Sequence, residues 1–88
     1  MNFSEFRKRH QTLVWANPGA SEEIWIRSAL VRPQFECLLD AVLTFGLARV
    51  EREWEILLSD GDPDALRARS TTDRMMGNIR LGHQRALA

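Results

Sequence analysis

Residues 33–58 read PQFECLLDAVLTFGLARVEREWEILL and contain two apolar stripes that meet at Gly46. On each side of the glycine an apolar residue recurs every three or four positions, which is the spacing of one face of an α-helix. Such a face must be buried against other elements. The stretch therefore predicts two helices, 33–45 and 47–58, that end or kink at Gly46. The stripe residues are Phe35, Leu38, Leu39, Val42 and Phe45 before the glycine, and Leu47, Val50, Trp54, Leu57 and Leu58 after it.

Capping and turn residues extend the helical prediction toward the N-terminus. Asn2 or Ser4 is the expected N-cap of a first helix, which continues to the turn sequence Asn17-Pro18-Gly19-Ala20. Ser21 then caps a second helix over residues 22–32, with two glutamates at the positive end of its dipole.

A break and two further helices are expected toward the C-terminus. Residues 59–63, SDGDP, are the clearest break in the chain, and their last two residues are a typical helix start. A short helix is expected over 63–69. Ser70 and Asp73 have the spacing of a capping box, which predicts a last helix from about residue 72. The expected fold class is all-α, a single small domain of five to six short helices in orthogonal, bundle-like packing.

Within this one domain, residues 1–60 are the expected helical core and 61–88 a C-terminal helical extension. The extension contains Gly77 and Gly82, and each glycine inside a helix costs about 1 kcal/mol relative to alanine. Two interpretations stay open. Either residues 70–88 are a partner-binding arm that becomes ordered on complex formation, or the glycines let this helix approach another one closely within the core.

The composition describes a small, electrically neutral chain. Its 88 residues include 12 basic and 12 acidic side chains, so the formal net charge is zero. Acids dominate residues 33–60 and bases dominate both ends, a distribution that favours charge-guided docking or simply solvated helix faces. Surface ion pairs are expected between Arg49 and Glu53 and between Arg52 and Glu55.

The search for catalytic and metal-binding motifs gives no candidate. The sequence contains no phosphate-binding glycine loop, no closely spaced cysteine pair and no zinc-protease motif. His10 and His83 have no acid or cysteine at a metal-ligand spacing, and the only cysteine, Cys37, lies in an apolar run that predicts a buried thiol. We therefore expect a non-enzyme without cofactor or metal. With no secretion signal and no apolar stretch of about 20 residues, we also expect it to be cytoplasmic.

Aromatic, methionine and arginine side chains are the candidate binding residues. Trp54 continues an apolar stripe and is expected in the core. Trp15, beside a turn, and Trp25, on a short helix, are candidates for a partner contact because tryptophan is enriched at interfaces. Methionines suit adaptable contact surfaces. The predicted partner-binding residues are Trp15, Trp25, Met75, Met76, Ile79 and Arg80.

Two other functions stay open. A small DNA-binding transcriptional regulator would contact phosphates through arginines near the C-terminus, although zero net charge and the acidic helix after Gly46 disfavour it. A self-associating helical scaffold would bind only further copies of the chain. The arginines of the DNA-binding alternative are Arg67, Arg69, Arg74, Arg80 and Arg85.

Several stretches taken together resemble a family of small bacterial proteins. They are VWANPG (14–19), IRSALVRP (26–33), LDAV (39–42), FGL (45–47), EW (53–54) and DGDP (60–63), followed by Thr72, Arg74, Asn78, Ile79 and Gly82. The pattern is similar to proteins encoded beside nucleotidyltransferase-fold toxins of the abortive-infection kind, where the small protein is regarded as the antitoxin. The resemblance implies a protein that binds and restrains a cognate toxin, and it implies no catalytic residue. The mechanism we expect is stoichiometric masking, in which exposed apolar and arginine side chains cover the active cleft of the partner.

Overall fold

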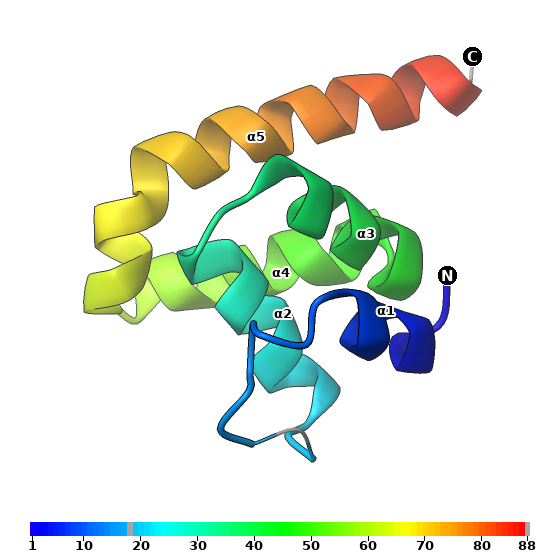
Figure 1. Ribbon diagram of the computed structural model, residues 1–88. Coiled ribbons are helices and arrows are strands. Elements are labelled where there is room, and N and C mark those ends of the chain that lie inside the picture. Colours follow the sequence, from blue (N-terminus) through cyan, green and yellow to red (C-terminus); the bar gives the residue numbers. More distant parts are fainter. Residues whose placement is uncertain (18, 88) are drawn as a thin grey trace.

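The computed structural model of the protein describes residues 1–17 and 19–87, and every regular element in this part of the chain is an α-helix. The predicted all-α class, a compact globule of five to six helices, is therefore confirmed (Figure 1). The five helices are α1 (Phe3–Arg9), α2 (Glu22–Val31), α3 (Phe35–Phe45), α4 (Leu47–Ser59) and α5 (Pro63–Leu87).

The first helix begins where the sequence predicts but ends earlier. Asn2 is its N-cap, since the side-chain oxygen accepts a hydrogen bond from the Glu5 N–H at 2.8 Å. The prediction of a helix reaching residue 17 is wrong. α1 ends at Arg9, because His10 leaves helical geometry (φ −121°, ψ 45°) and its ring contacts Asp40 of α3 instead.

The chain directly after α1 forms turns. Residues 10–16 are turns rather than helix. The Ala20 N–H donates to the Asn17 carbonyl at 3.0 Å, as the turn sequence predicts, although Pro18 of that turn lies outside the described residues. Ser21 caps α2 as expected, with its hydroxyl oxygen accepting from a backbone N–H of the first helical turn.

Gly46 joins α3 directly to α4, as the sequence predicts. Its backbone dihedrals, φ 92° and ψ 143°, lie in a region open almost only to glycine, so the chain can change direction here without a loop. The preceding helix begins at Phe35 and not at Pro33, since Gln34 adopts the extended N-cap conformation.

The two helices predicted after residue 62 are one continuous helix. α5 has 25 residues, and Asp62 caps it by accepting from the Ala65 N–H at 2.9 Å. Figure 1 shows the first turns of α5 at an angle to the remainder, so the helix bends without ending. The bend lies in the region where the sequence predicts a boundary.

The predicted capping box of α5 does not form because Asp73 has other partners. Its carboxylate accepts a hydrogen bond from Nε1 of Trp54 at 2.7 Å and lies 3.6 Å from the Arg69 guanidinium one turn earlier. Asp73 therefore ties α5 to α4 and stabilises the middle of the helix, where a boundary is predicted. Trp54 is buried, as expected for a core residue.

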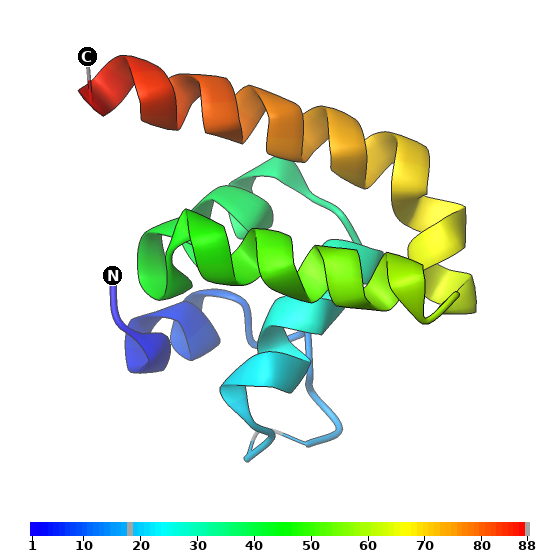
Figure 2. The same ribbon diagram turned by 180° about the vertical axis from the view of Figure 1, so that it is seen from behind.

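The core lies around α2, which contacts α3, α4 and α5. α5 contributes Thr72, Met76 and Ile79 to this core, and the Thr72 hydroxyl donates to the Leu30 carbonyl at 2.7 Å. That carbonyl belongs to the last turn of α2, where helical partners are missing. Figures 1 and 2 both place α1 and α5 on opposite sides of α3 and α4. α1 and α5 thus belong to two separate surfaces of the molecule.

The glycines of α5 do not serve close helix packing. In the described part of the chain, a Cβ added at Gly77 or Gly82 meets no atom within 4 Å, so the close-approach interpretation is wrong. Residues 80–86 are all exposed, and this end of α5 projects past the core. The interpretation of residues 70–88 as a partner-binding arm stays a prediction. The last residue of that range, Ala88, lies outside the described residues.

Alanine substitutions at two glycines should have opposite effects on stability. Gly46→Ala places a Cβ at φ 92° and should lower the free energy of unfolding by about 1–3 kcal/mol. Gly77→Ala has open space for the new methyl group and should raise it by up to about 1 kcal/mol through helix propensity. Urea denaturation of both variants checks the pair, and a loss of stability in Gly77→Ala would show that α5 is not helical there.

Candidate functional site

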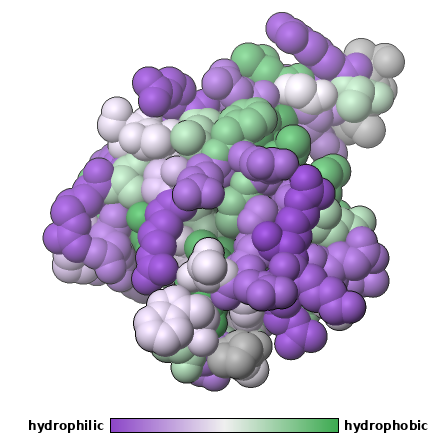
Figure 3. Space-filling model, in the orientation of Figure 1, coloured by the Kyte–Doolittle hydropathy of each residue, from purple (hydrophilic) through white to green (hydrophobic). Residues whose placement is uncertain are grey.

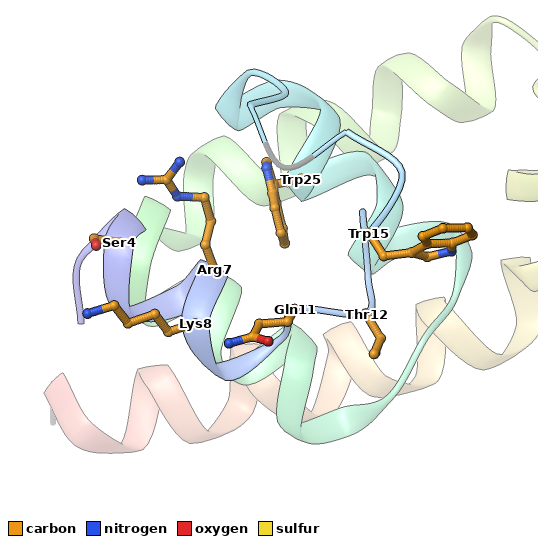
Figure 4. Close-up of a pocket in the computed structure, with 7 residues that line it drawn as sticks. All are labelled: Ser4, Arg7, Lys8, Gln11, Thr12, Trp15 and Trp25. Atoms are coloured by element: carbon orange, nitrogen blue, oxygen red, sulfur yellow. The ribbon is translucent and has the colours of Figure 1, made fainter.

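A hollow of about 530 Å³ lies between α1, the turns that follow it and α2 (Figure 4). Four of its lining residues occupy positions i, i+3, i+4 and i+7 of the chain from α1 onward, so one stripe of this segment forms one wall. Trp25 comes from α2 and Trp15 from the turns. The lining residues are Ser4, Arg7, Lys8, Gln11, Thr12, Trp15 and Trp25.

The two tryptophans of the hollow have opposite environments. Trp25 is 2% exposed and stacks edge-on against the rings of Phe3 and Phe6 in the core. Trp15 is 76% exposed, which makes it the most exposed large hydrophobic side chain in the described part of the chain. Figure 4 shows its indole set apart from the α1 side chains, across the hollow. Trp15 therefore offers a large apolar surface that the fold itself does not bury.

The wall of the hollow on α1 carries two cations without carboxylate partners. Among the described residues, neither Arg7 nor Lys8 forms an ion pair, whereas the next basic residue, Arg9, lies 3.0 Å from Glu36. The Arg7 guanidinium lies over the Phe3 ring, 4.6 Å from its centroid. The hollow thus combines positive charge with aromatic surface.

A buried acid on α3 fixes the end of α1 and with it the wall of the hollow. Asp40 is 4% exposed, and its Oδ2 lies 2.8 Å from Nε2 of His10 and 3.3 Å from Nε of Arg9. No spacing in the sequence indicates this contact, since His10 and Asp40 are 30 residues apart. The contact explains why the chain leaves α1 at this point and carries Trp15 to the edge of the hollow.

The structure separates the six predicted partner-binding residues. Trp25, Met76 and Ile79 are buried in the core. Met75 is half-buried. The exposed Arg80 is on the α5 side of the molecule, and its guanidinium lies 3.1 Å from Glu51, whose hydrogen bond raises the pKa of Arg80. Trp15 and Trp25 are the members of the set that line the hollow, and Trp15 is the exposed one of the two.

The arginines of the DNA-binding alternative do not form one basic surface. Arg67 pairs with Asp64, Arg69 with Asp73 and Arg80 with Glu51. Arg74 and Arg85 have no ion pair within the described residues, and spacings of 7 and 11 place them on the same stripe of α5 as Arg67. This stripe is basic but narrow.

Among the described residues, neither ion pair predicted within α4 forms, and the first is replaced by two pairs between α4 and α2. Arg49 lies 2.7 Å from Glu22 of α2, and Glu53 lies 2.8 Å from Arg27 of α2. The predicted partners share the same helix, but α2 packs across α4 and offers closer ones. Arg52 and Glu55 form no pair in the described part of the chain.

The histidines and the cysteine are the side chains with catalytic potential. In the described part of the chain each of them either takes part in a structural contact or stands alone. No group of three or more metal-ligating side chains occurs among the described residues, and His83 is exposed on α5. Cys37 is buried as predicted, and burial, with a smaller effect of the nearby Asp40 carboxylate, raises the pKa of its thiol from 9.0 to about 11.

The raised pKa predicts slow modification of Cys37. The thiolate is the reactive form, and a pKa higher by two units lowers its population at pH 8 about 100-fold. Reaction with a disulfide reagent should therefore be at least about 100-fold slower in buffer than in concentrated urea, where the thiol is exposed. Equal rates in the two solvents would show that Cys37 is accessible in the folded protein.

The described helices include none that is long and apolar enough to cross a membrane. Comparison of the chain with protein families, with curated proteins and with solved structures finds no match.

Proposed function

We propose that this protein is a non-enzymatic interaction module that binds a protein partner through the Trp15 hollow. One observation carries the proposal: a 76% exposed tryptophan stands at the edge of a hollow of about 530 Å³. Tryptophan and arginine are the side chains most enriched among residues that dominate binding energy, and such residues favour pockets from which water is excluded. Docking there buries apolar area that the free protein leaves in water.

The resemblance described above supplies the class of partner. It implies an antitoxin whose target is a nucleotidyltransferase-type toxin, and the mechanism we propose is stoichiometric masking of the toxin's active cleft. Arg7 and Lys8, which have no ion-pair partner among the described residues, support this choice, because a cleft that works on nucleotides with divalent metal ions contains carboxylates. Basic side chains beside an exposed aromatic ring are complementary to such a cleft.

The test is co-purification from the native cells with tagged protein, comparing the wild type with Trp15→Ala. A nucleotidyltransferase-like protein should be recovered in stoichiometric amount with the wild type, and Trp15→Ala should lower its affinity at least about tenfold, as expected for a central interface tryptophan. Leu43→Ala is the matched control, since Leu43 is 61% exposed on α3 and does not line the hollow.

Three outcomes would contradict the proposal. A partner retained equally by Trp15→Ala and Leu43→Ala would show that docking uses another surface. Recovery of promoter DNA with strong salt dependence would favour the DNA-binding alternative, in which Arg74 and Arg85 are the arginines without an ion pair among the described residues. Recovery of the chain alone, with light scattering that reports a multimer, would favour the self-associating scaffold.

A further inference from the structure

We propose that the Trp15 hollow binds a carboxylate group next to an apolar side chain, specifically an acidic residue with a neighbouring aromatic or aliphatic residue on the partner protein. The biological occupant rests on the proposed function above. The chemistry of the hollow rests on the isolated chain and can be tested without any partner.

Two unsatisfied donors mark the hollow. In the described part of the chain, the buried side-chain nitrogens without a hydrogen-bond partner are Nε of Arg7 and Nε1 of Trp25. Both residues line the same hollow, and both atoms carry an N–H that can only donate. Leaving such a donor unpaired costs about 1–3 kcal/mol, so a ligand that brings an oxygen acceptor relieves this cost.

The charge of the wall selects an anionic acceptor over a neutral one. Arg7 and Lys8 lie on the same wall, and no described carboxylate pairs with either. A hydrogen bond between a charged donor and a carboxylate is roughly twice as strong as one between neutral groups. A carboxylate also accepts from several donors at once, which suits the combination of a guanidinium, an indole and an ammonium group.

The remaining lining favours an apolar group beside the carboxylate. The exposed Trp15 lines the hollow at its edge, where Figure 4 shows the indole set apart from the α1 side chains and directed outward. An aromatic or aliphatic side chain inserted there buries the indole face. Figure 3 shows the face of the molecule that is turned to the viewer in Figure 1, and most side chains on this face are hydrophilic. The hydrophobic side chains on it gather along and beneath α5.

Exposed side chains on the α1 wall of the hollow can move to admit a ligand. Lys8 and Gln11 are exposed, and Arg7 is half-buried. Long exposed side chains change rotamer within nanoseconds, so they can admit a carboxylate without any change in α1 or α2. The helices themselves are held by the Phe6 and Asp40 contacts described above.

The test uses 3-phenylpropionate as the probe and 3-phenylpropanamide as its neutral counterpart. The chain contains three tryptophans, so a ¹H–¹⁵N spectrum shows three indole N–H signals. Millimolar 3-phenylpropionate should shift the Trp25 signal downfield, as an N–H does on forming a hydrogen bond, and should also move the Trp15 signal. The Trp54 signal is the internal reference, because its Nε1 already donates to Asp73 at 2.7 Å.

Two variants test whether the positive charge of the hollow causes the binding of 3-phenylpropionate. Arg7→Gln should weaken binding of the propionate about tenfold, the size of one charge-assisted contact, and leave binding of the amide unchanged. Arg52→Gln is the matched control, since Arg52 is an exposed arginine on α4 that does not line the hollow. It should bind the propionate like the wild type.

Equal shifts with the propionate and the amide would overturn the carboxylate assignment, as would a Trp25 signal that stays in place or an Arg7→Gln variant that binds normally. These results are separate from those of the co-purification. Loss of the partner in Trp15→Ala together with no response to the propionate would keep the proposed function and reject the carboxylate.

Discussion

Replacing Phe6 with alanine should lower the free energy of unfolding by about 3–5 kcal/mol, the cost of removing a fully buried aromatic ring. Phe6 is 0% exposed and joins a cluster of rings, with centroid distances of 6.2 Å to Trp25, 5.5 Å to Phe45 and 4.9 Å to His10. It is also the buried residue of α1, which has only seven residues and depends on packing for its stability.

Urea denaturation followed by tryptophan fluorescence measures the effect. Phe6→Leu is the graded variant and should cost less than Phe6→Ala, because it keeps most of the buried volume. Leu43→Ala, at an exposed site, should change stability by no more than about 0.5 kcal/mol. A Phe6→Ala protein as stable as the Leu43→Ala control would mean that α1 is not docked on the core and that the hollow does not exist in solution.

Replacing Thr72 with valine should lower the free energy of unfolding by about 1–3 kcal/mol, although the two side chains have nearly the same shape. Thr72 is 0% exposed, and its hydroxyl donates to the Leu30 carbonyl at 2.7 Å. The variant leaves that carbonyl, in the last turn of α2, buried without this donor. The loss comes from desolvation and not from packing.

Thr72→Ser separates the contribution of the hydrogen bond from that of packing, because it keeps the hydroxyl and removes one methyl group. It should cost about 1 kcal/mol or less, from the lost burial of that group. Denaturation of both variants under the same conditions gives the comparison. If Thr72→Val proved as stable as the wild type, α5 would not be docked on α2 as the structure shows.

Local sequence signals predict most of the helices. The stripes on either side of Gly46 require two helices, and the glycine is where the chain changes direction. Asn2, Ser21 and Asp62 mark three helix starts because a cap bonds to an N–H only a few residues away. Interactions within one turn of helix are visible in the sequence for this reason.

Contacts between distant residues explain the differences. The early end of α1 depends on the contact between His10 and Asp40. In the same way, α5 continues without a boundary because Asp73 accepts a hydrogen bond from Trp54. Neither pair has a signature in the sequence. The hollow depends on the first of these contacts, so Trp15 could be recognised as a candidate but its neighbours Arg7 and Lys8 could not.

Two surfaces on opposite sides of the molecule compete for the role of partner-binding site, the Trp15 hollow on α1 and the projecting end of α5. Hydrogen exchange of the protein alone and in complex with its co-purified partner distinguishes them directly. We expect binding to add protection in residues 4–16 and to leave the protection of residues 80–86 unchanged. Added protection confined to residues 80–86 would contradict it and assign partner binding to the end of α5.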